Sequence, residues 1–269
     1  MDSDAKDTLN RESLFHDAWA ASTPLDQIQV VACFEAPTAQ ENRFILRHMG
    51  PLKGKRILEV GTGLGEAAVY FALHGAQVTA TDISPGMVDC AVQLAKFYGV
   101  KIEGKVQAAE ELNVPSDYYD FVYVANTFHH VTNKPHLFSE IKKALKPGGR
   151  FYSWDPLAYN PVINQYRRMA DKVRTPDETP LTFKDLGLAR QYFKNVGHCE
   201  FWIATLALFL KYYLVDRVHP NESRYWKRIL EEEPKNLWWW FPLRAMDSVL
   251  TRMPLFRRLA WNMVMWGTR

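Results

Sequence analysis

Short runs of β-branched and aromatic residues alternate with longer amphipathic stretches between residues 56 and 155. This alternation is typical of βαβ units, in which crossover helices join parallel strands. Strands are expected at residues 56–60, 77–82, 101–108, 119–126 and 150–155. Helices are expected between them at residues 66–74, 85–98 and 135–145. The pattern therefore predicts a doubly wound α/β fold with a parallel sheet.

The rest of the chain divides around this region. Residues 1–50 are expected to form a helical leader that folds over the site as a lid, and residues 51–156 the core domain. Residues 157–192 are expected to be an insertion on the substrate side. Residues 193–269 hold two further predicted strands, 197–206 and 261–266. Between these strands, residues 211–258 are expected to form a helical cap insertion.

Composition places the chain among ordinary globular proteins, since 47% of its 269 residues are hydrophobic and 23% are charged. The three cysteines, Cys33, Cys90 and Cys199, lie far apart, which excludes a disulfide framework and a Cys-x-x-Cys metal site, and no other metal motif is expected. The N-terminal residues lack the apolar segment of a secretory signal. The longest apolar run, residues 201–210, is too short to cross a bilayer. A cytoplasmic location is therefore expected.

Charge and aromatic residues are unevenly distributed. The net charge of +3 does not by itself indicate a nucleic-acid partner. From residue 234 onwards, however, six basic residues stand against a single acid, Asp247, and seven of the nine tryptophans follow residue 200. The predicted cap is thus both basic and aromatic.

A glycine-rich turn follows the first predicted strand. Gly61, Gly63 and Gly65 allow the backbone to approach a ligand closely, and Asp82, at the end of the second strand, is placed to accept the hydroxyl groups of a ribose. A dinucleotide fingerprint needs a third small residue where Glu66 stands, and that carboxylate would repel a pyrophosphate. Together with Glu59 it favours a cationic ligand such as S-adenosylmethionine.

Six ordered segments carry a resemblance to a known family. They are residues 59–65 (EVGTGLG), 82–87 (DISPGM), 109–112 (AEEL), 119–126 (YDFVYVAN), 129–131 (HHV) and 145–149 (LKPGG). In this order they resemble the motifs of class I S-adenosylmethionine-dependent methyltransferases, over about residues 40–155. The resemblance implies a Rossmann-like seven-stranded sheet whose last strand is antiparallel.

The resemblance also implies cofactor contacts. The loop of Gly61, Thr62, Gly63 and Gly65 would lie beside the methionine part, close to Glu59, and Asp82 would hold the ribose. Ile83 and Met87 would flank the adenine, whose amino group would lie near Ala109 and Glu110, and Asn126 would meet the methionine amino end. The family often has an acid where Ala108 stands, so here only Glu110 or a backbone group would supply that adenine contact.

Catalytic candidates stand at the carboxyl ends of strands, where doubly wound folds place their sites. His129 and His130 follow the fourth strand, and Asp155 ends the fifth. Each is a candidate for the proton transfer that an acceptor carrying a proton requires. The structural alternatives are packing of the histidines beside the sheet and capping of a turn by Asp155.

Acceptor contacts are expected from the segment after strand five and from the leader. Arginines with tyrosine and asparagine can bind a phosphate or carboxylate. The alternative is that these arginines form salt bridges with Asp177 and Glu178. In the leader, Phe15, His16 and Trp19 follow helical spacing and are expected to form the lid or pack in the core. The predicted acceptor-binding residues are Trp19, Tyr159, Asn160, Tyr166, Arg167 and Arg174.

The cap decides the expected substrate class. Its aromatic and basic residues can lie at a membrane interface or roof a pocket for an apolar acceptor. The alternative is an ordinary helical cap, and no RNA-binding module is recognised. The sequence therefore predicts methylation of a lipophilic small molecule, with or without an anionic or phosphorylated head, of isoprenoid, quinone-like, phenolic or lipid type. The alternatives are a soluble natural-product acceptor and a non-catalytic module that binds S-adenosylmethionine.

Overall fold

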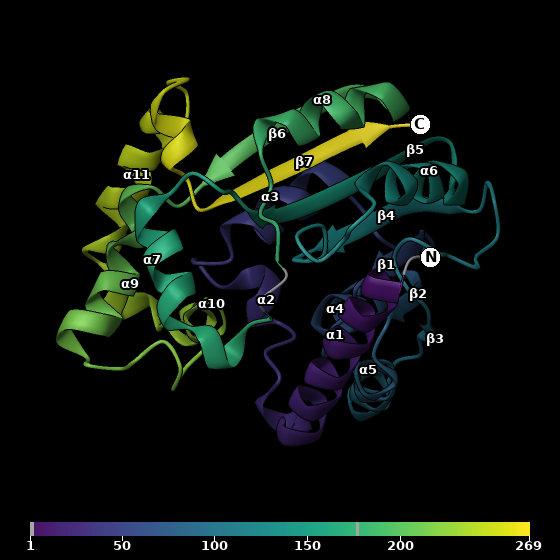
Figure 1. Cartoon of the computed structure of the whole chain (residues 1–269), viewed down its shortest axis with the longest axis horizontal. Coiled ribbons are helices and arrows are strands. Elements are labelled where there is room, and N and C mark those ends of the chain that lie inside the picture. Colours follow the sequence, from purple (N-terminus) through teal and green to yellow (C-terminus); the bar gives the residue numbers. More distant parts are fainter. Residues whose placement is uncertain (1–2, 176–177) are drawn as a thin grey trace.

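A seven-stranded sheet forms the centre of the computed structural model, which describes residues 3–175 and 178–269 (Figure 1). The strand order is β3-β2-β1-β4-β5-β7-β6, and β7 is antiparallel to both of its neighbours. The strands are β1 (Arg56–Val60), β2 (Gln77–Asp82), β3 (Glu103–Val106), β4 (Tyr119–Ala125), β5 (Leu145–Pro156), β6 (Lys194–Phe201) and β7 (Asn262–Thr268). The Rossmann-like doubly wound sheet and its antiparallel last strand are confirmed.

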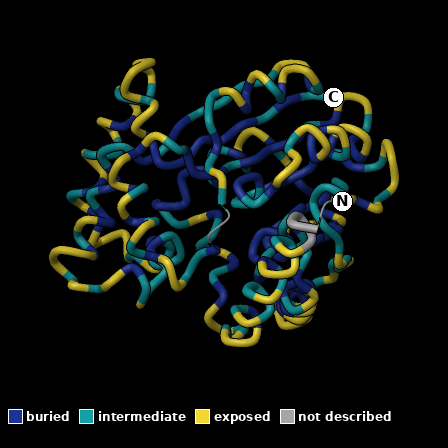
Figure 2. Tube along the Cα trace, in the orientation of Figure 1, coloured by how far each residue is buried: buried dark blue, intermediate teal, exposed yellow. Residues whose placement is uncertain are grey.

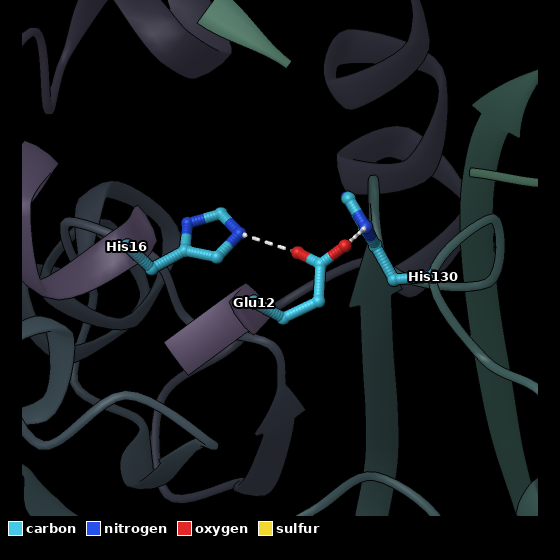
Figure 3. Close-up of side chains that lie close together, drawn as sticks. All are labelled: Glu12, His16 and His130. Carbon is cyan, nitrogen blue, oxygen red and sulfur yellow. Dashed lines mark hydrogen bonds and ion pairs between the residues drawn. The ribbon is translucent and has the colours of Figure 1, made fainter. Parts of the chain in front are cut away.

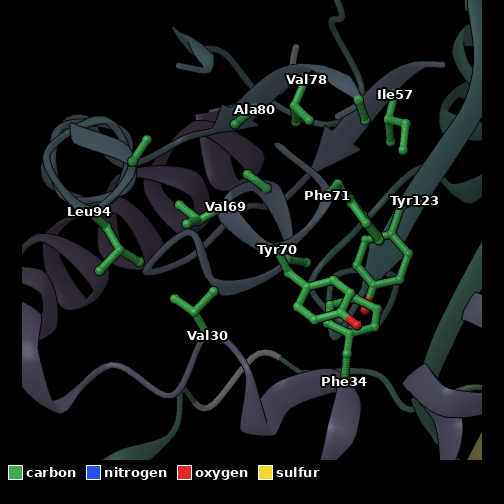
Figure 4. Close-up of a cluster of buried hydrophobic side chains, with 14 of the residues drawn as sticks. Val30, Phe34, Ile57, Val69, Tyr70, Phe71, Val78, Ala80, Leu94 and Tyr123 are labelled. Atoms are coloured by element: carbon green, nitrogen blue, oxygen red, sulfur yellow. The ribbon is translucent and has the colours of Figure 1, made fainter. Parts of the chain in front are cut away.

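Side chains alternate between two hydrophobic layers because successive residues of a strand point to opposite faces. On one face, Ile57, Val78 and Tyr123 pack against helices from both the leader and the core (Figure 4). On the other face, Leu58 and Val122 pack with α6 and α8. The helices of the first layer are α1 (Ser3–Ser22), α2 (Ala32–Glu35), α3 (Gln40–Met49), α4 (Glu66–Leu73) and α5 (Pro85–Phe97). Those of the second are α6 (Lys134–Ala144) and α8 (Phe183–Tyr192).

Three expected boundaries were wrong. The strand expected at residues 197–206 ends at Phe201, because Asp247 accepts the backbone N–H groups of Ile203, Ala204 and Thr205 and turns the chain into a 3-10 helix. β5 begins at Leu145 rather than at residue 150, since Leu145 already pairs with β4. β3 covers only four residues of the eight expected.

A cap lies at the end of the molecule where α7 (Pro161–Met169), α9 (Ala207–Leu210), α10 (Tyr225–Arg228) and α11 (Trp240–Leu250) gather (Figure 1). It has its own aromatic core, in which Trp202, Trp240, Tyr212 and Tyr225 are buried. The cap begins directly after β6, a few residues earlier than expected. The segment expected as a substrate-side insertion divides, since α7 joins the cap core while α8 packs on the sheet.

The cap leaves many apolar side chains in solvent, and exposed residues follow its outer edge in Figure 2. Trp238, Leu255 and Val215 are 75%, 75% and 72% exposed. Within the described ranges, none of the helices combines the length and apolar character that a bilayer crossing requires.

Candidate cofactor and acceptor site

A cavity of about 260 Å³ opens where β1 and β4 end and α1 lies over the sheet. This is the crevice at the carboxyl ends of parallel strands where doubly wound folds bind ligands. Most of the predicted cofactor residues line it: Glu59, Gly61, Thr62, Gly63, Asp82, Ile83, Ala109, Glu110 and Asn126. Gly65 and Met87 do not, since Gly65 packs on Ala91 of α5 and Met87 is fully buried in the core. Their predicted contacts with the cofactor therefore stay predictions, and in this structure both residues pack behind the loop.

The glycine loop needs its glycines for conformation and for space. Gly61 and Gly63 have φ angles of +74° and +53°, which L side chains rarely adopt. A side chain at Gly61 would collide with Thr127, whereas a Cβ at Gly63 would meet nothing within 4 Å. The backbone at Gly63 thus faces open space in the cavity, so a ligand can approach it closely.

The N–H groups of this loop are already engaged. Those of Gly61 and Thr62 donate to the carbonyl of Thr81, and that of Gly65 donates to the carbonyl of Thr62. The N–H of Gly63 donates to Oδ2 of Asp82 at 2.9 Å. A pyrophosphate site needs several converging free N–H groups at this turn. The loop therefore fits a ligand without phosphate better than a dinucleotide.

Acidic groups stand beside the loop instead. Glu59 is buried, and its Oε2 accepts a hydrogen bond from Thr62 Oγ1 at 2.7 Å. Burial raises the pKa of Glu59 to about 8, with Glu66 and Asp82 contributing in the same direction. A cationic ligand would compensate this buried carboxylate. Glu59 thus fits the sulfonium and amino group of S-adenosylmethionine.

The adenine end shows a donor that the sequence reasoning missed. Gln107 lines the cavity, and its Nε2 is buried with no hydrogen-bond partner among the described residues. Its Oε1 accepts the N–H of Asn113, which fixes the amide orientation. Glu110 is less free than expected, since its Oε1 accepts from Thr132. Gln107 is therefore a further candidate for this contact beside Glu110 and the backbone groups that the sequence predicts.

His129 and Asp155 form a buried pair at the floor of the cavity. Oδ1 of Asp155 lies 2.7 Å from Nδ1 of His129 and also accepts the backbone N–H of His129. Burial lowers the pKa of His129 well below the ordinary imidazole value and raises the pKa of Asp155. Burial therefore favours the neutral ring. In the tautomer with hydrogen on Nδ1, this hydrogen faces Asp155 and the lone pair lies on Nε2, 4.0 Å from Oε2 of Glu178. Asp155 does not line the cavity and contacts His129 from behind.

His130 belongs to a different network, which ties the leader to the core (Figure 3). Glu12 of α1 lies between two imidazoles: its Oε1 is 3.0 Å from His130 Nδ1, and its Oε2 is 3.4 Å from His16 Nε2. Burial alone would raise the pKa of Glu12, but the hydrogen bonds from His130 and His16 hold it well below its ordinary value. The three side chains offer ligand types that suit a transition metal, yet in Figure 3 the carboxylate separates the two rings as a bridge.

Further contacts hold α1 over the cavity. Oδ1 of Asp17 accepts from Ser84 Oγ at 2.5 Å and from the N–H of Gly86 at 2.8 Å. Trp19, further along the same helix, lines the cavity and packs edge to face on Trp226 of the cap. Leader and cap therefore meet above the site, as a lid would.

Only two of the six predicted acceptor residues, Trp19 and Arg174, line the cavity. Arg167 and Arg174 both form ion pairs with Glu178, as the alternative of salt bridges in this segment predicts. Asp177, the other acid named in that alternative, lies outside the described residues. Asn160 caps α7 by accepting from Val162 and Ile163. Tyr159 stacks on Phe183 at the surface, and Tyr166 is buried in the cap core. These residues follow strand five in sequence, but α7 carries most of them away from the opening.

The opposite wall was not foreseen. Tyr123 donates to Asn42 Oδ1 at 2.6 Å and accepts from Trp154 Nε1 at 3.0 Å. Asn262 donates to Glu41, whose pKa burial raises to about 7. From the cap come Arg224, Trp226 and Lys227, and Lys227 pairs with Glu66. These residues lie on separate elements without a shared motif, so only the tertiary fold assembles them.

Comparison with known proteins places the central region in a family. Residues 58–153 match the model of a methyltransferase domain. Phosphoethanolamine N-methyltransferase 3 of Arabidopsis thaliana is 32% identical over 36% of this chain and 20% of its own length. The ubiquinone/menaquinone biosynthesis C-methyltransferase of Bordetella parapertussis is 30% identical over 52% of this chain and 66% of its own length. The chain therefore spans only part of its curated relatives.

Solved structures share the architecture. Phosphoethanolamine N-methyltransferase 2 of Haemonchus contortus, in complex with phosphomonomethylethanolamine and S-adenosylhomocysteine, superposes with a TM-score of 0.57 at 19% identity. The match covers 85% of this chain and 52% of the other. The fold is that of class I methyltransferases, and residues 58–153 carry the match to a methyltransferase domain. These findings support the predicted cofactor, S-adenosylmethionine.

Proposed function

We propose that the chain transfers a methyl group from S-adenosylmethionine to a lipophilic small molecule that carries an anionic group. The observation that supports this most directly is the single cavity that joins the glycine loop, with Glu59 and Asp82, to a wall containing Trp19, Trp226 and Arg224. The first set suits the cofactor, and the second suits an apolar body with a negative charge. The relatives act on small molecules as different as phosphoethanolamine and quinone precursors, so they leave the acceptor open.

The cofactor, when bound, supplies a methyl group on a positively charged sulfur. With an oxygen or nitrogen acceptor, the acceptor lone pair would bond to this methyl carbon, and the electrons of the bond from carbon to sulfur would pass to the sulfur. The acceptor proton passes to Nε2 of His129, which Asp155 orients. A carbon acceptor that is already nucleophilic would need this base only after the transfer.

His130 and His16 belong to the closing of the lid in this proposal. Their contacts with Glu12 hold α1 above the cavity and keep water away from the transfer. Gln107 would take the adenine contact through its unpaired Nε2. His129 and His130 are adjacent in the sequence, but in this proposal His129 takes part in proton transfer and His130 in closing the lid.

The cap is proposed to rest on an anionic membrane surface, from which a lipophilic acceptor would enter. Large apolar side chains are exposed at residues 213–215 and again at residues 253–256. After residue 234 the one acid, Asp247, is buried, so this part of the surface carries only basic charge. Exposed apolar side chains with interspersed arginines fit the interface of an anionic bilayer.

The test is a transfer assay with radiolabelled S-adenosylmethionine and a panel of phenols, quinols and isoprenoids, each with and without a carboxylate or phosphate. Activity is expected with anionic members and is expected to rise with phosphatidylglycerol vesicles. Val215→Glu with Leu255→Glu should abolish co-sedimentation with these vesicles, whereas the control Phe97→Glu, at an exposed site on α5, should not. Vesicle-independent transfer to soluble acceptors would favour the natural-product alternative. Tight cofactor binding with no transfer to any acceptor would favour a non-catalytic module.

A further inference from the structure

Arg224 differs from the other arginines of the acceptor region in having no carboxylate partner among the described residues. Arg167 and Arg174 share Glu178, and Arg228, one turn further along, pairs with Asp216 at 2.9 Å. Within residues 3–175 and 178–269, Arg224 makes no ion pair and its side chain donates no hydrogen bond. It nevertheless lines the cavity and is only partly exposed.

Its guanidinium is held in place by an aromatic ring. Cζ of Arg224 lies 4.3 Å from the centre of the Trp19 ring. Trp19 in turn packs edge to face on Trp226, at 5.6 Å between ring centres. A cation–π contact occupies none of the guanidinium N–H groups with an acceptor atom, so they stay available to an anion. Arg224 therefore presents a fixed and empty donor fork.

Partial burial of the charged Arg224 side chain is energetically unfavourable as long as no ligand compensates the charge. It lowers the pKa of Arg224 below its usual range, although the group remains charged at neutral pH. A partly desolvated cation gains most from an anion that it can bind in a bidentate manner. Lys227, the neighbouring cation, is already paired with Glu66 and so is less available.

We propose that Arg224, stacked on Trp19, is the subsite that binds the carboxylate or phosphate group of the acceptor. This inference rests on the proposed function. It assigns the anion-binding site to the cap and not to the arginines that follow strand five. Because Trp19 belongs to α1 and Arg224 to the cap, an anion bound here would also bridge the two halves of the lid. The negative charge of the acceptor would thus help to close the lid over the site.

The experiment uses phenyl phosphate and its neutral counterpart phenol as probes. Each is titrated calorimetrically into the full chain, with and without saturating S-adenosylhomocysteine. We expect the wild type to prefer phenyl phosphate by tenfold or more. Arg224→Gln should remove that preference, and Arg224→Lys should retain only a minor part, because lysine keeps the charge but not the fork. Arg228→Gln is the matched control, an arginine also stacked on a ring, but outside the cavity, and should behave as wild type.

Two results would overturn the subsite: no preference for phenyl phosphate in the wild type, or an unchanged preference in Arg224→Gln. Affinity for S-adenosylhomocysteine is measured in the same variants and is expected to stay within twofold. Absence of S-adenosylhomocysteine binding in the wild type would instead contradict the proposed function. The titrations without S-adenosylhomocysteine still compare Arg224 variants in that case, so the two failures remain distinguishable.

Discussion

His129 and Asp155 are the residues whose protonation the structure constrains most tightly. Asp155 is fully buried and meets both Nδ1 and the backbone N–H of His129. Because burial lowers the pKa of His129, the proton that its side chain would take up in acid is excluded in the folded state. The unfolded chain binds that proton below about pH 6.5, so His129 lowers the stability as the pH falls below that value, whereas Asp155, whose pKa burial raises, contributes in the opposite direction.

Asp155→Asn tests whether Asp155 orients the His129 ring without contributing to the binding of S-adenosylmethionine. An asparagine can turn its amide toward Nδ1 and favour the tautomer with hydrogen on Nε2, which removes the base. We expect kcat to fall by roughly 100-fold or more for an oxygen or nitrogen acceptor, with the affinity for S-adenosylmethionine within twofold. In the wild type, NMR titration should place the His129 pKa below 6.5. The control Asp89→Asn changes an exposed carboxylate on α5. A kcat for Asp155→Asn within threefold of wild type would remove the proton-transfer role.

Single residues show where sequence reasoning succeeds. Gly61, Glu59 and Asp82 belong to one continuous turn and its neighbouring strand end, so spacing alone brought them together, and all line the cavity. Tyr159 and Arg167 also follow a strand end, but the direction in which α7 leaves the sheet could not be read from their spacing. Gln107 was missed because an amide without a partner becomes visible only once its surroundings are known.

At the scale of elements, α1 is the helix on which closure of the site depends. The helical spacing of its aromatic residues indicated a helix over the site, but not the contacts that hold it, because the partners of Glu12 and Asp17 lie about 118 and 69 residues away in sequence. Short-range patterns therefore predicted the crossover helices of the core better than the contacts of the leader or the π-helical turn at Lys211–Val215. The predicted cap likewise began too late because Asp247, far along the chain, ends β6.

Glu12→Gln tests the hold of this helix. The substitution keeps the shape of the side chain but removes the negative charge that His130 and His16 stabilise. We expect faster hydrogen exchange in residues 9–19 and a loss of S-adenosylmethionine affinity of about three- to tenfold, since the lid then closes less often. Asp7→Asn, an exposed carboxylate on the same helix, serves as the control. Unchanged exchange in Glu12→Gln would mean that Asp17 and Trp19 hold α1 without the histidine bridge.

The molecule as a whole places this cavity between the seven-stranded sheet and two additions, the leader and the cap. The sheet supplies the cofactor loop, and the additions supply Trp19, Trp226 and Arg224. The six motifs of the core identified the fold and the cofactor because each is local. The aromatic and basic character of the cap and the place of Trp19 could be predicted, but the acceptor wall joins residues some 200 positions apart, so the pairing of Trp19 with Arg224 and Trp226 could not.

Calorimetric titration with S-adenosylmethionine and, separately, NAD tests the central claim most directly, repeated on Asp82→Ala. Asp82 fixes the loop through Gly63 and the next turn through Ser84, besides lining the cavity. We predict binding of S-adenosylmethionine with no binding of NAD, and a loss of affinity of at least tenfold in the variant. Circular dichroism checks that the variant folds, and Asp89→Asn serves again as the exposed control. Binding of NAD alone, or of neither ligand, would contradict the account.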